Sequence, residues 1–205
     1  ANFKLLRIMN NLRTQTDEDL LRLYIDGNNS AFDVLLKRYE SKVFTYLLYS
    51  VRTQELAEDL FQDVFIKIIT TLRQKKYTEY GKFSSWVMRI AHNLVIDYFR
   101  QSKNDNTVSN DEIEFDLFAN SSLGLEESIE AQMIDKQTLE EVKGLIGLLP
   151  QGQRDVVLMR FYQDLSFKEI ADITGVSINT ALGRMRYAII NLRKLAHENK
   201  ILLVG

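Results

Sequence analysis

The chain has 205 residues and a formal net charge of −2, which is enough for one large domain or two small ones with a core in each. It has no cysteine and only two histidines, so a disulfide framework and thiol chemistry are excluded and a structural zinc site lacks its usual ligands. Its single proline and its wealth of Leu, Ile, Glu, Lys and Arg predict an all-α fold. No signal-peptide pattern or long apolar run is present, so we expect a cytoplasmic protein without membrane insertion.

The first hundred residues show three helical patterns. Thr16 and the acids after it cap a short helix that ends near Gly27, and Ser30 begins a longer one. Thr53 begins a third helix that reaches about Gln74, with an apolar stripe on one side. This periodicity predicts a helical core.

The outer surface of the third helix mixes acidic and apolar side chains. They recur at spacings of three and four residues: Asp59, Gln62, Asp63 and Ile66. Such a surface is either a solvated acidic face, the commonest case, or a docking face for a basic helix of a partner. A third reading, in which Asp59 and Asp63 are metal ligands of an α-helical enzyme, lacks the Glu-x-x-His pairs of helical-bundle metal sites.

Basic and aromatic residues alternate between residues 73 and 100, around a loop of about ten residues. Lysine and arginine follow a nucleic-acid backbone and aromatic faces stack on bases, so the mixture suits melted or single-stranded nucleic acid. A helix is expected to begin near Ser84 or Ser85. Trp86 is spaced for packing as well as for stacking, and His92 is expected to be structural.

Residues 103 to 125 lose helical spacing and carry one basic and five acidic residues, which predicts an acidic flexible linker. We therefore expect domains at 1–102 and 126–205. The second domain resumes helical spacing at Glu126, and Pro150 is expected in the first turn of its next helix.

The stretch from Ser166 to Leu195 predicts a helix-turn-helix. Ser166 and Glu169 form a capping box, Gly175 supplies the turn, and Ser177 caps a second helix. No acidic residue occurs between residues 173 and 197, which suits entry into a DNA major groove. An ordinary amphipathic hairpin with a basic face is the alternative.

Three segments in this order resemble the extracytoplasmic-function group of bacterial RNA polymerase sigma factors. They are AEDLFQDVF at 57–65, FSSWVMRIAHNLVIDYFR at 83–100 and LPQGQRDVVLMRFYQDLSFKEIADITGVSINTALGRMRYA at 149–188. The resemblance implies a promoter-specific initiation factor that binds RNA polymerase core and promoter DNA, has no catalytic residue or cofactor, and is often held by an anti-sigma factor. It also implies that the acidic linker runs through the polymerase channel.

The resemblance assigns the docking face on residues 59–66 to the largest subunit of the polymerase. It assigns the loop and the following helix to the minus-ten element, where a base is flipped into a pocket, through Lys76, Tyr77, Lys82, Phe83, Trp86, Arg89, Asn93, Asp97 and Arg100. It assigns the second helix of the helix-turn-helix to the minus-thirty-five element, through Ser177, Asn179, Thr180, Leu182, Gly183, Arg184, Arg186 and Tyr187.

Leu182 and Tyr187 depart from the family, which usually has basic residues there. Fewer phosphate contacts follow, so the base preference cannot be transferred from relatives. A stand-alone helix-turn-helix regulator with a helical sensor domain explains residues 126–195 equally well, but it requires neither the acidic docking helix nor the aromatic-basic loop.

Overall fold

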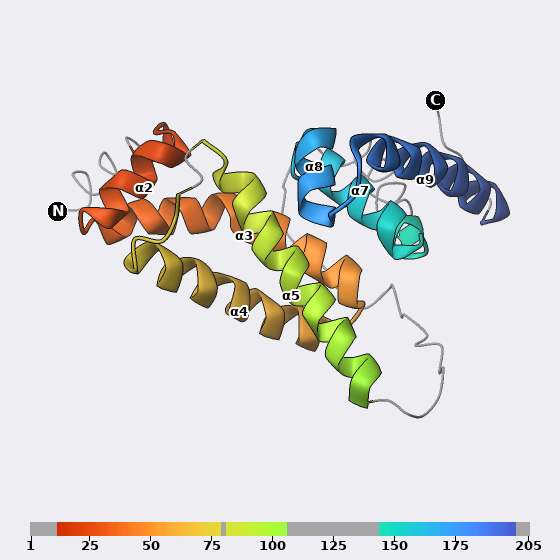
Figure 1. Ribbon diagram of the computed structural model, residues 1–205, viewed down its shortest axis with the longest axis horizontal. Helices are drawn as coiled ribbons and strands as arrows, with labels where there is room; N and C mark the ends of the chain where they lie inside the picture. The colour runs from red at the N-terminus through yellow and green to blue at the C-terminus, as the bar shows by residue number, and fades with distance from the viewer. Residues whose placement is uncertain (1–11, 79–80, 106–143, 200–205) are drawn as a thin grey trace, which may run out of the picture.

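The computed structural model describes residues 12–78, 81–105 and 144–199, and within these ranges every regular element is a helix (Figure 1). With the labels of Figure 1, they are α2 (Asp17–Ile25), α3 (Asn29–Val51), α4 (Gln54–Arg73), α5 (Phe83–Asp105), α7 (Gln151–Phe161), α8 (Phe167–Thr174) and α9 (Ile178–Glu198). The all-α prediction is confirmed.

The amino-terminal domain is formed by α2 to α5, in which each helix packs on the next and α3 also packs on α5. The predicted cap is present, because the Thr16 side chain accepts a hydrogen bond from the amide of Asp19. Between α3 and α4 the chain reverses at Arg52, which takes the left-handed conformation. The helices enclose fully buried side chains such as Leu20, Tyr46 and Ile68.

The carboxy-terminal domain is formed by α7, α8 and α9, which all contact one another. Val156, Leu158 and Met159 of α7 are buried against Ile170 of α8 and Ala181 of α9. Helices α7 and α8 have only 11 and 8 residues, so the core of this domain is small, and the buried residues of α9 lie on one side of that helix.

The two domains lie against each other. Helix α3 packs on α7, and α5 packs on α8 (Figure 1). A single apolar cluster therefore continues from Val43 and Ala91 of the first domain to Val156 and Ile173 of the second.

Three predicted boundaries were displaced. Helix α3 begins at Asn29, one residue before the expected Ser30, and α5 runs to Asp105, past the expected start of the linker at 103. Pro150 is the N-cap of α7 rather than a first-turn residue. The rest of the linker and the helix expected from Glu126, up to residue 143, lie outside the described residues. None of the described helices is both long and apolar enough to span a membrane.

Candidate nucleic-acid and partner interfaces

The helix-turn-helix forms as its sequence predicts. Ser166 and Glu169 make the complete capping box, and Gly175 ends α8 in the left-handed conformation with φ 67°. The Ser177 hydroxyl accepts a hydrogen bond from the Thr180 amide at 3.0 Å and so caps α9. The turn therefore presents the amino end of α9 to solvent.

The predicted minus-thirty-five residues lie together at this end of α9. Asn179, Thr180 and Arg186 are exposed, and Leu182 and Tyr187 keep 44% and 62% of their surface. Gly183 is half-buried. The face combines one exposed arginine with small polar and apolar side chains.

Arg184 lies differently from the other predicted minus-thirty-five residues. It is half-buried, and its guanidinium lies over Gly152 of α7, where a Cβ atom would come within 3.0 Å of the Arg184 Cζ. The Asn191 side chain fixes the same two helices by donating a hydrogen bond to Gln153 at 2.8 Å. The Arg184 side chain is therefore directed toward α7.

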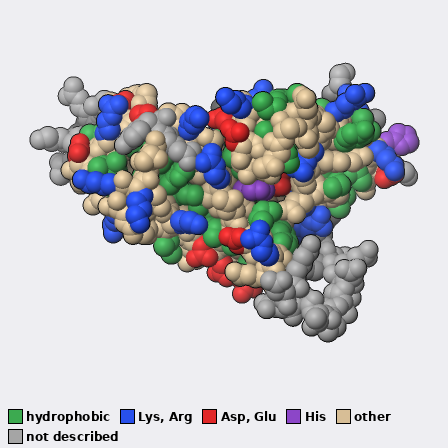
Figure 2. Space-filling view, in the orientation of Figure 1, with side chains coloured by type: hydrophobic (Ala, Val, Ile, Leu, Met, Phe, Trp, Pro, Cys, Tyr) green, Lys and Arg blue, Asp and Glu red, His purple; other side chains and the backbone are tan. Residues whose placement is uncertain are grey.

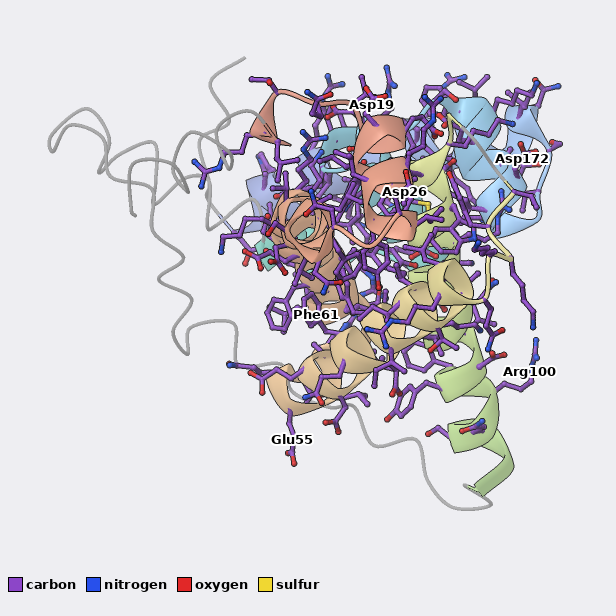
Figure 3. The ribbon with its side chains drawn as sticks, turned by 90° about the vertical axis from the view of Figure 1, so that its left-hand side faces the viewer. Asp19, Asp26, Glu55, Phe61, Arg100 and Asp172 are labelled. Atoms are coloured by element: carbon purple, nitrogen blue, oxygen red, sulfur yellow. The ribbon has the colours of Figure 1, made fainter. Side chains whose placement is uncertain are left out.

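The predicted docking residues of α4 share one exposed surface. Asp59, Gln62 and Asp63 are exposed, and Ile66 keeps 60% of its surface, whereas Leu60 and Val64 between them are buried. Acidic side chains gather along the edge formed by α4, and Glu55 points from this helix into solvent (Figures 2 and 3). Each is available to a partner.

The predicted minus-ten residues divide into exposed and buried sets. Lys76, Lys82, Asn93, Asp97 and Arg100 are exposed, and Arg89 is half-buried. Figure 3 shows Arg100 extending from α5 on the opposite side from Glu55 of α4. The exposed minus-ten residues lie on α5 and on the loop before it, whereas the docking residues lie on α4.

The three predicted minus-ten aromatic rings require a correction. Tyr77, Phe83 and Trp86 keep only 4%, 4% and 8% of their surface and so cannot stack on a base as they lie. The Tyr77 ring lies 4.8 Å from Trp86 and 6.0 Å from Phe83, in edge-on contacts. Large rings favour burial and such edge-to-face packing, so these residues anchor both ends of the loop to the core.

Glu18 was not singled out from the sequence, yet it holds the loop between α4 and α5. Its carboxylate accepts a hydrogen bond from the amide of Gly81, which has φ 78°. Lys75 at the other end of the loop also has a positive φ, 54°. A hollow of about 230 Å³ adjoins this end and is lined by residues that include Tyr24, Arg73 and Lys75.

A buried polar cluster lies where the two domains meet, and sequence reasoning missed it except for His92. We call Tyr46, His92, Asp155 and Arg154 the interdomain polar cluster. The Tyr46 hydroxyl lies 2.8 Å from Nδ1 of His92 and donates a hydrogen bond to Asp155 at 3.2 Å. Arg154 donates to the carbonyl of Gly147 at 2.9 Å. All four side chains are at least nine-tenths buried.

Burial changes the acidity of this cluster. It raises the pKa of Asp155 to about 6, although Arg154, the hydrogen bond from Tyr46, and Arg184 oppose the shift. Burial and, second, the charge of Arg184 lower the pKa of His92 to about 4. Burial and Arg52 lower the pKa of Arg154, and burial raises that of Tyr46. At neutral pH, His92 is therefore uncharged, as expected of a structural histidine.

The described residues contain no group of three or more His, Asp or Glu side chains placed to hold a metal ion. Fold and surfaces instead define a two-domain, helix-turn-helix DNA-binding protein. Residues 35–104 match the family described as Sigma-70 region 2, and residues 139–182 match Sigma-70, region 4. The chain belongs to the extracytoplasmic-function group of RNA polymerase sigma factors, which direct promoter recognition in transcription initiation.

The chain is similar to several characterised members of the group. It is 27% identical to SigM of Bacillus subtilis over 71% of this chain and 82% of the relative. It is 31% identical to BldN of Streptomyces coelicolor over 73% of this chain and 54% of that protein. The sigma-E factor of Haemophilus influenzae is 26% identical over 91% and 95% of the two chains.

Two solved structures share the fold. CnrH, solved in complex with the cytosolic domain of CnrY, superposes with a TM-score of 0.60 at 20% identity, over 89% of this chain and 97% of that one. RpoE of Bartonella quintana, solved with the anti-sigma factor NepR, gives a TM-score of 0.59 at 19% identity, over 81% and 96%.

Proposed function

We propose that the sigma factor uses its exposed surfaces for three separate contacts. The exposed acidic and apolar surface of α4 binds RNA polymerase core, the loop and exposed side of α5 hold the minus-ten strand, and the amino end of α9 reads the minus-thirty-five duplex. The observation that carries this proposal is that the three surfaces lie on different elements and consist of residues outside the buried core, so partners can bind them without disturbing it.

The core-binding surface is Asp59, Gln62, Asp63 and Ile66. Carboxylates around an exposed isoleucine match a basic helical partner, because charges at the rim steer the approach and the apolar side chain is buried on contact. The resemblance to the family implies that this partner is a coiled coil of the largest polymerase subunit.

The minus-ten contact falls to the basic and amide members of the predicted set that are not buried. Lys76, Lys82, Arg89 and Arg100 supply positive charge for phosphates, and Asn93 supplies hydrogen bonds for a base edge. The hollow between α2 and α4 lies beside the loop, and Arg73 and Lys75 line it. We assign the flipped base to this hollow, because unstacked bases require a pocket next to cations that hold the backbone.

The minus-thirty-five contact falls to Asn179, Thr180, Leu182, Arg186 and Tyr187. Asparagine and arginine can read base edges, and Leu182 can contact a thymine methyl. Few exposed cations imply weak binding by the domain alone, so polymerase has to supply the remaining affinity.

We extend the proposal to the rest of the assembly. The first domain ends with α5 at Asp105, and the acidic segment that follows it up to residue 125 joins the two domains through the polymerase channel. The protein acts in the cytoplasm, performs no catalysis, and stabilises the open promoter by binding it better than the closed one. An anti-sigma factor holds it in reserve, as NepR is bound to RpoE in the related structure.

Run-off transcription with purified core on a genomic library tests this function. We expect discrete transcripts that depend on the added chain and whose starts share two upstream elements. Retention on core without transcripts would refute promoter recognition. Tight binding of the free chain to a DNA site, without retention on core, would instead favour a stand-alone regulator.

A further inference from the structure

The hollow between α2 and α4 is positively charged. Its polar side chains are Tyr24, Asn29, Arg73 and Lys75, and none of the described residues that line it is acidic. Arg73 and Lys75 are exposed, and neither forms an ion pair within the described ranges. A concave surface lined by charges of one sign concentrates ions of the opposite sign, so this hollow favours an anion.

The amino end of α3 forms one wall of the same hollow. Gly27 and Asn29 line it, and α3 begins at Asn29. The N-cap residue, Asn28, makes no side-chain hydrogen bond to the helix, and the first turn contains no acidic residue. The first backbone N–H groups of a helix have no acceptor within the helix, and the helix dipole makes this end partly positive. An anion in the hollow can accept hydrogen bonds from these groups.

A buried side chain points to a ligand independently of the helix end. Tyr24 keeps 8% of its surface, and its ring packs on Phe32 with the centroids 4.8 Å apart. Its hydroxyl makes no hydrogen bond to any residue that the structure describes, although a buried hydroxyl normally has a partner. The hydroxyl is not one of the fully enclosed polar atoms, so it faces the hollow that Tyr24 lines. A ligand in the hollow can therefore supply the missing partner.

The size of the hollow limits the ligand. Its volume of about 230 Å³ is below the range of pockets that hold drug-sized molecules, so a compact group fits it best. A phosphate group is compact, and its strong acceptor oxygens can bond to an arginine, a hydroxyl and backbone amides together. Asp26, which precedes Gly27, is exposed and does not line the hollow, so it leaves the space open to an anion.

We propose that the hollow binds the phosphate group of a small phosphomonoester, such as a nucleoside monophosphate, and that this ligand keeps the flipped base out. The second half of the inference rests on the proposed assignment of the flipped base to this hollow. A phosphomonoester carries a charge of about −1.5 to −2 at neutral pH, whereas each phosphate of a DNA strand carries a single charge. The free ligand therefore gains more than the strand does from Arg73, Lys75 and the amino end of α3.

Calorimetric titration of the free chain with adenosine monophosphate tests the site, and adenosine is the matched ligand because it lacks only the phosphate. We expect the monophosphate to bind more tightly by about tenfold or more. Tyr24→Phe should weaken its binding about tenfold, because a hydrogen bond to a charged acceptor is lost while the ring still packs on Phe32. Asn29→Asp should weaken it further, because a carboxylate then occupies the amino end of α3.

Arg73→Ala should also weaken binding about tenfold, and Arg22→Ala is its matched control. Arg22 is an exposed arginine of α2 that pairs with Asp19 at 3.8 Å and does not line the hollow. This control should bind the monophosphate like the parent chain. Thermal unfolding separates lost binding from lost folding, because Asn29→Asp should stabilise the helix while it weakens binding. Equal binding of monophosphate and adenosine, or equal losses in Arg73→Ala and Arg22→Ala, would overturn the phosphate site.

Displacement of a strand tests the second half of the inference. The holoenzyme is loaded with a fluorescent single strand that carries the minus-ten sequence found by run-off transcription. Adenosine monophosphate should release this strand, and adenosine should not. If the monophosphate binds the free chain but leaves the strand in place, the competition is overturned and the phosphate site stands. A chain that binds the monophosphate but is never retained on core would count against the proposed function alone.

Discussion

The hydroxyl of Tyr46 donates a hydrogen bond to the carboxylate of Asp155, which lies 109 positions further along the chain. This bond joins α3 of the domain that contains region 2 to α7 of the domain that contains region 4. The bond is buried from solvent. Two groups with opposite shifts lie beside it, because the pKa of Asp155 is raised and the pKa of His92 is lowered.

These opposed shifts predict little net pH dependence from this contact. The pKa of Asp155 is raised when folded, so this acid adds stability as the pH falls from 7 to 5. The pKa of His92 is lowered, so this histidine removes stability over the same range. Each effect amounts to about 1–2 kcal/mol, and they nearly cancel.

Two substitutions should separate the effects. Relative to the parent chain, His92→Gln should gain about 1–2 kcal/mol in the free energy of unfolding between pH 7 and pH 5, and Asp155→Asn should lose a similar amount. Urea unfolding at both values measures the difference. If the free energy of unfolding changed equally with pH in all three chains, neither group would have a shifted pKa.

Asp63→Lys should abolish binding to core polymerase and leave the fold unchanged. Asp63 is exposed on α4, so a lysine there meets no buried neighbour. In the proposed complex it would face a basic partner, and like charges across an interface cost several kcal/mol. Co-elution with core measures the loss. Asp33→Lys, an exposed acid on α3, should bind normally, and normal binding by Asp63→Lys would remove α4 from the docking surface.

Trp86→Ala should destabilise the protein rather than act on melted DNA alone. The ring is 8% exposed and packs against Tyr77 and Phe83, and removing a buried tryptophan costs about 3–5 kcal/mol. Thermal unfolding measures this cost. Asn93→Ala, at an exposed position of the same helix, should unfold like the parent chain. A stable Trp86→Ala variant with poor strand opening would restore the stacking role.

Glu18→Ala should impair promoter opening while stability changes by no more than about 0.5 kcal/mol, because the residue acts on a surface loop. Its carboxylate fixes the Gly81 amide next to Lys82, and without it the loop samples other conformations. Permanganate reactivity of unpaired thymines measures opening. Glu40→Ala on α3 is the control and should open the promoter like the parent chain. If the loop serves only to hold the melted strand, a template that is already unpaired should restore transcription by Glu18→Ala.

Leu182→Arg should strengthen DNA binding by the holoenzyme. Leu182 is 44% exposed at the amino end of α9. One added phosphate contact makes the slope of the logarithm of the DNA-binding constant against the logarithm of the salt concentration steeper by about 0.9. Binding to a fixed promoter across a salt series gives the slope. Ile190→Arg adds the same charge further along α9 and should leave the slope unchanged. Equal slopes in both variants would argue against the assigned face.

Local signals predicted the fold well because they act within a few residues. Ser166, Glu169 and Gly175 encode the helix-turn-helix through capping and backbone conformation, which need no distant partner. The alternation of buried Leu60 and exposed Gln62 likewise follows from helical periodicity.

Long-range packing could not be predicted from the sequence in the same way. The rings of Tyr77 and Trp86 have the composition of a base-stacking platform, and only their mutual contact reveals that they are core. Asp155 resembles an ordinary surface acid, because its partner Tyr46 is brought to it by the packing of α3 on α7. Glu18 and Gly81 are likewise joined only by the fold.

The packing of α3 on α7 and of α5 on α8 has a consequence for promoter search, because it holds the two proposed DNA-binding faces at a fixed spacing. Two linked binding modules gain most of their strength from avidity, because the first contact raises the local concentration of the second site for its module. A chain whose modules are held together forfeits that gain while each module keeps its own modest affinity. With α3 packed on α7, each proposed DNA-binding face would thus bind by itself, without avidity from the other.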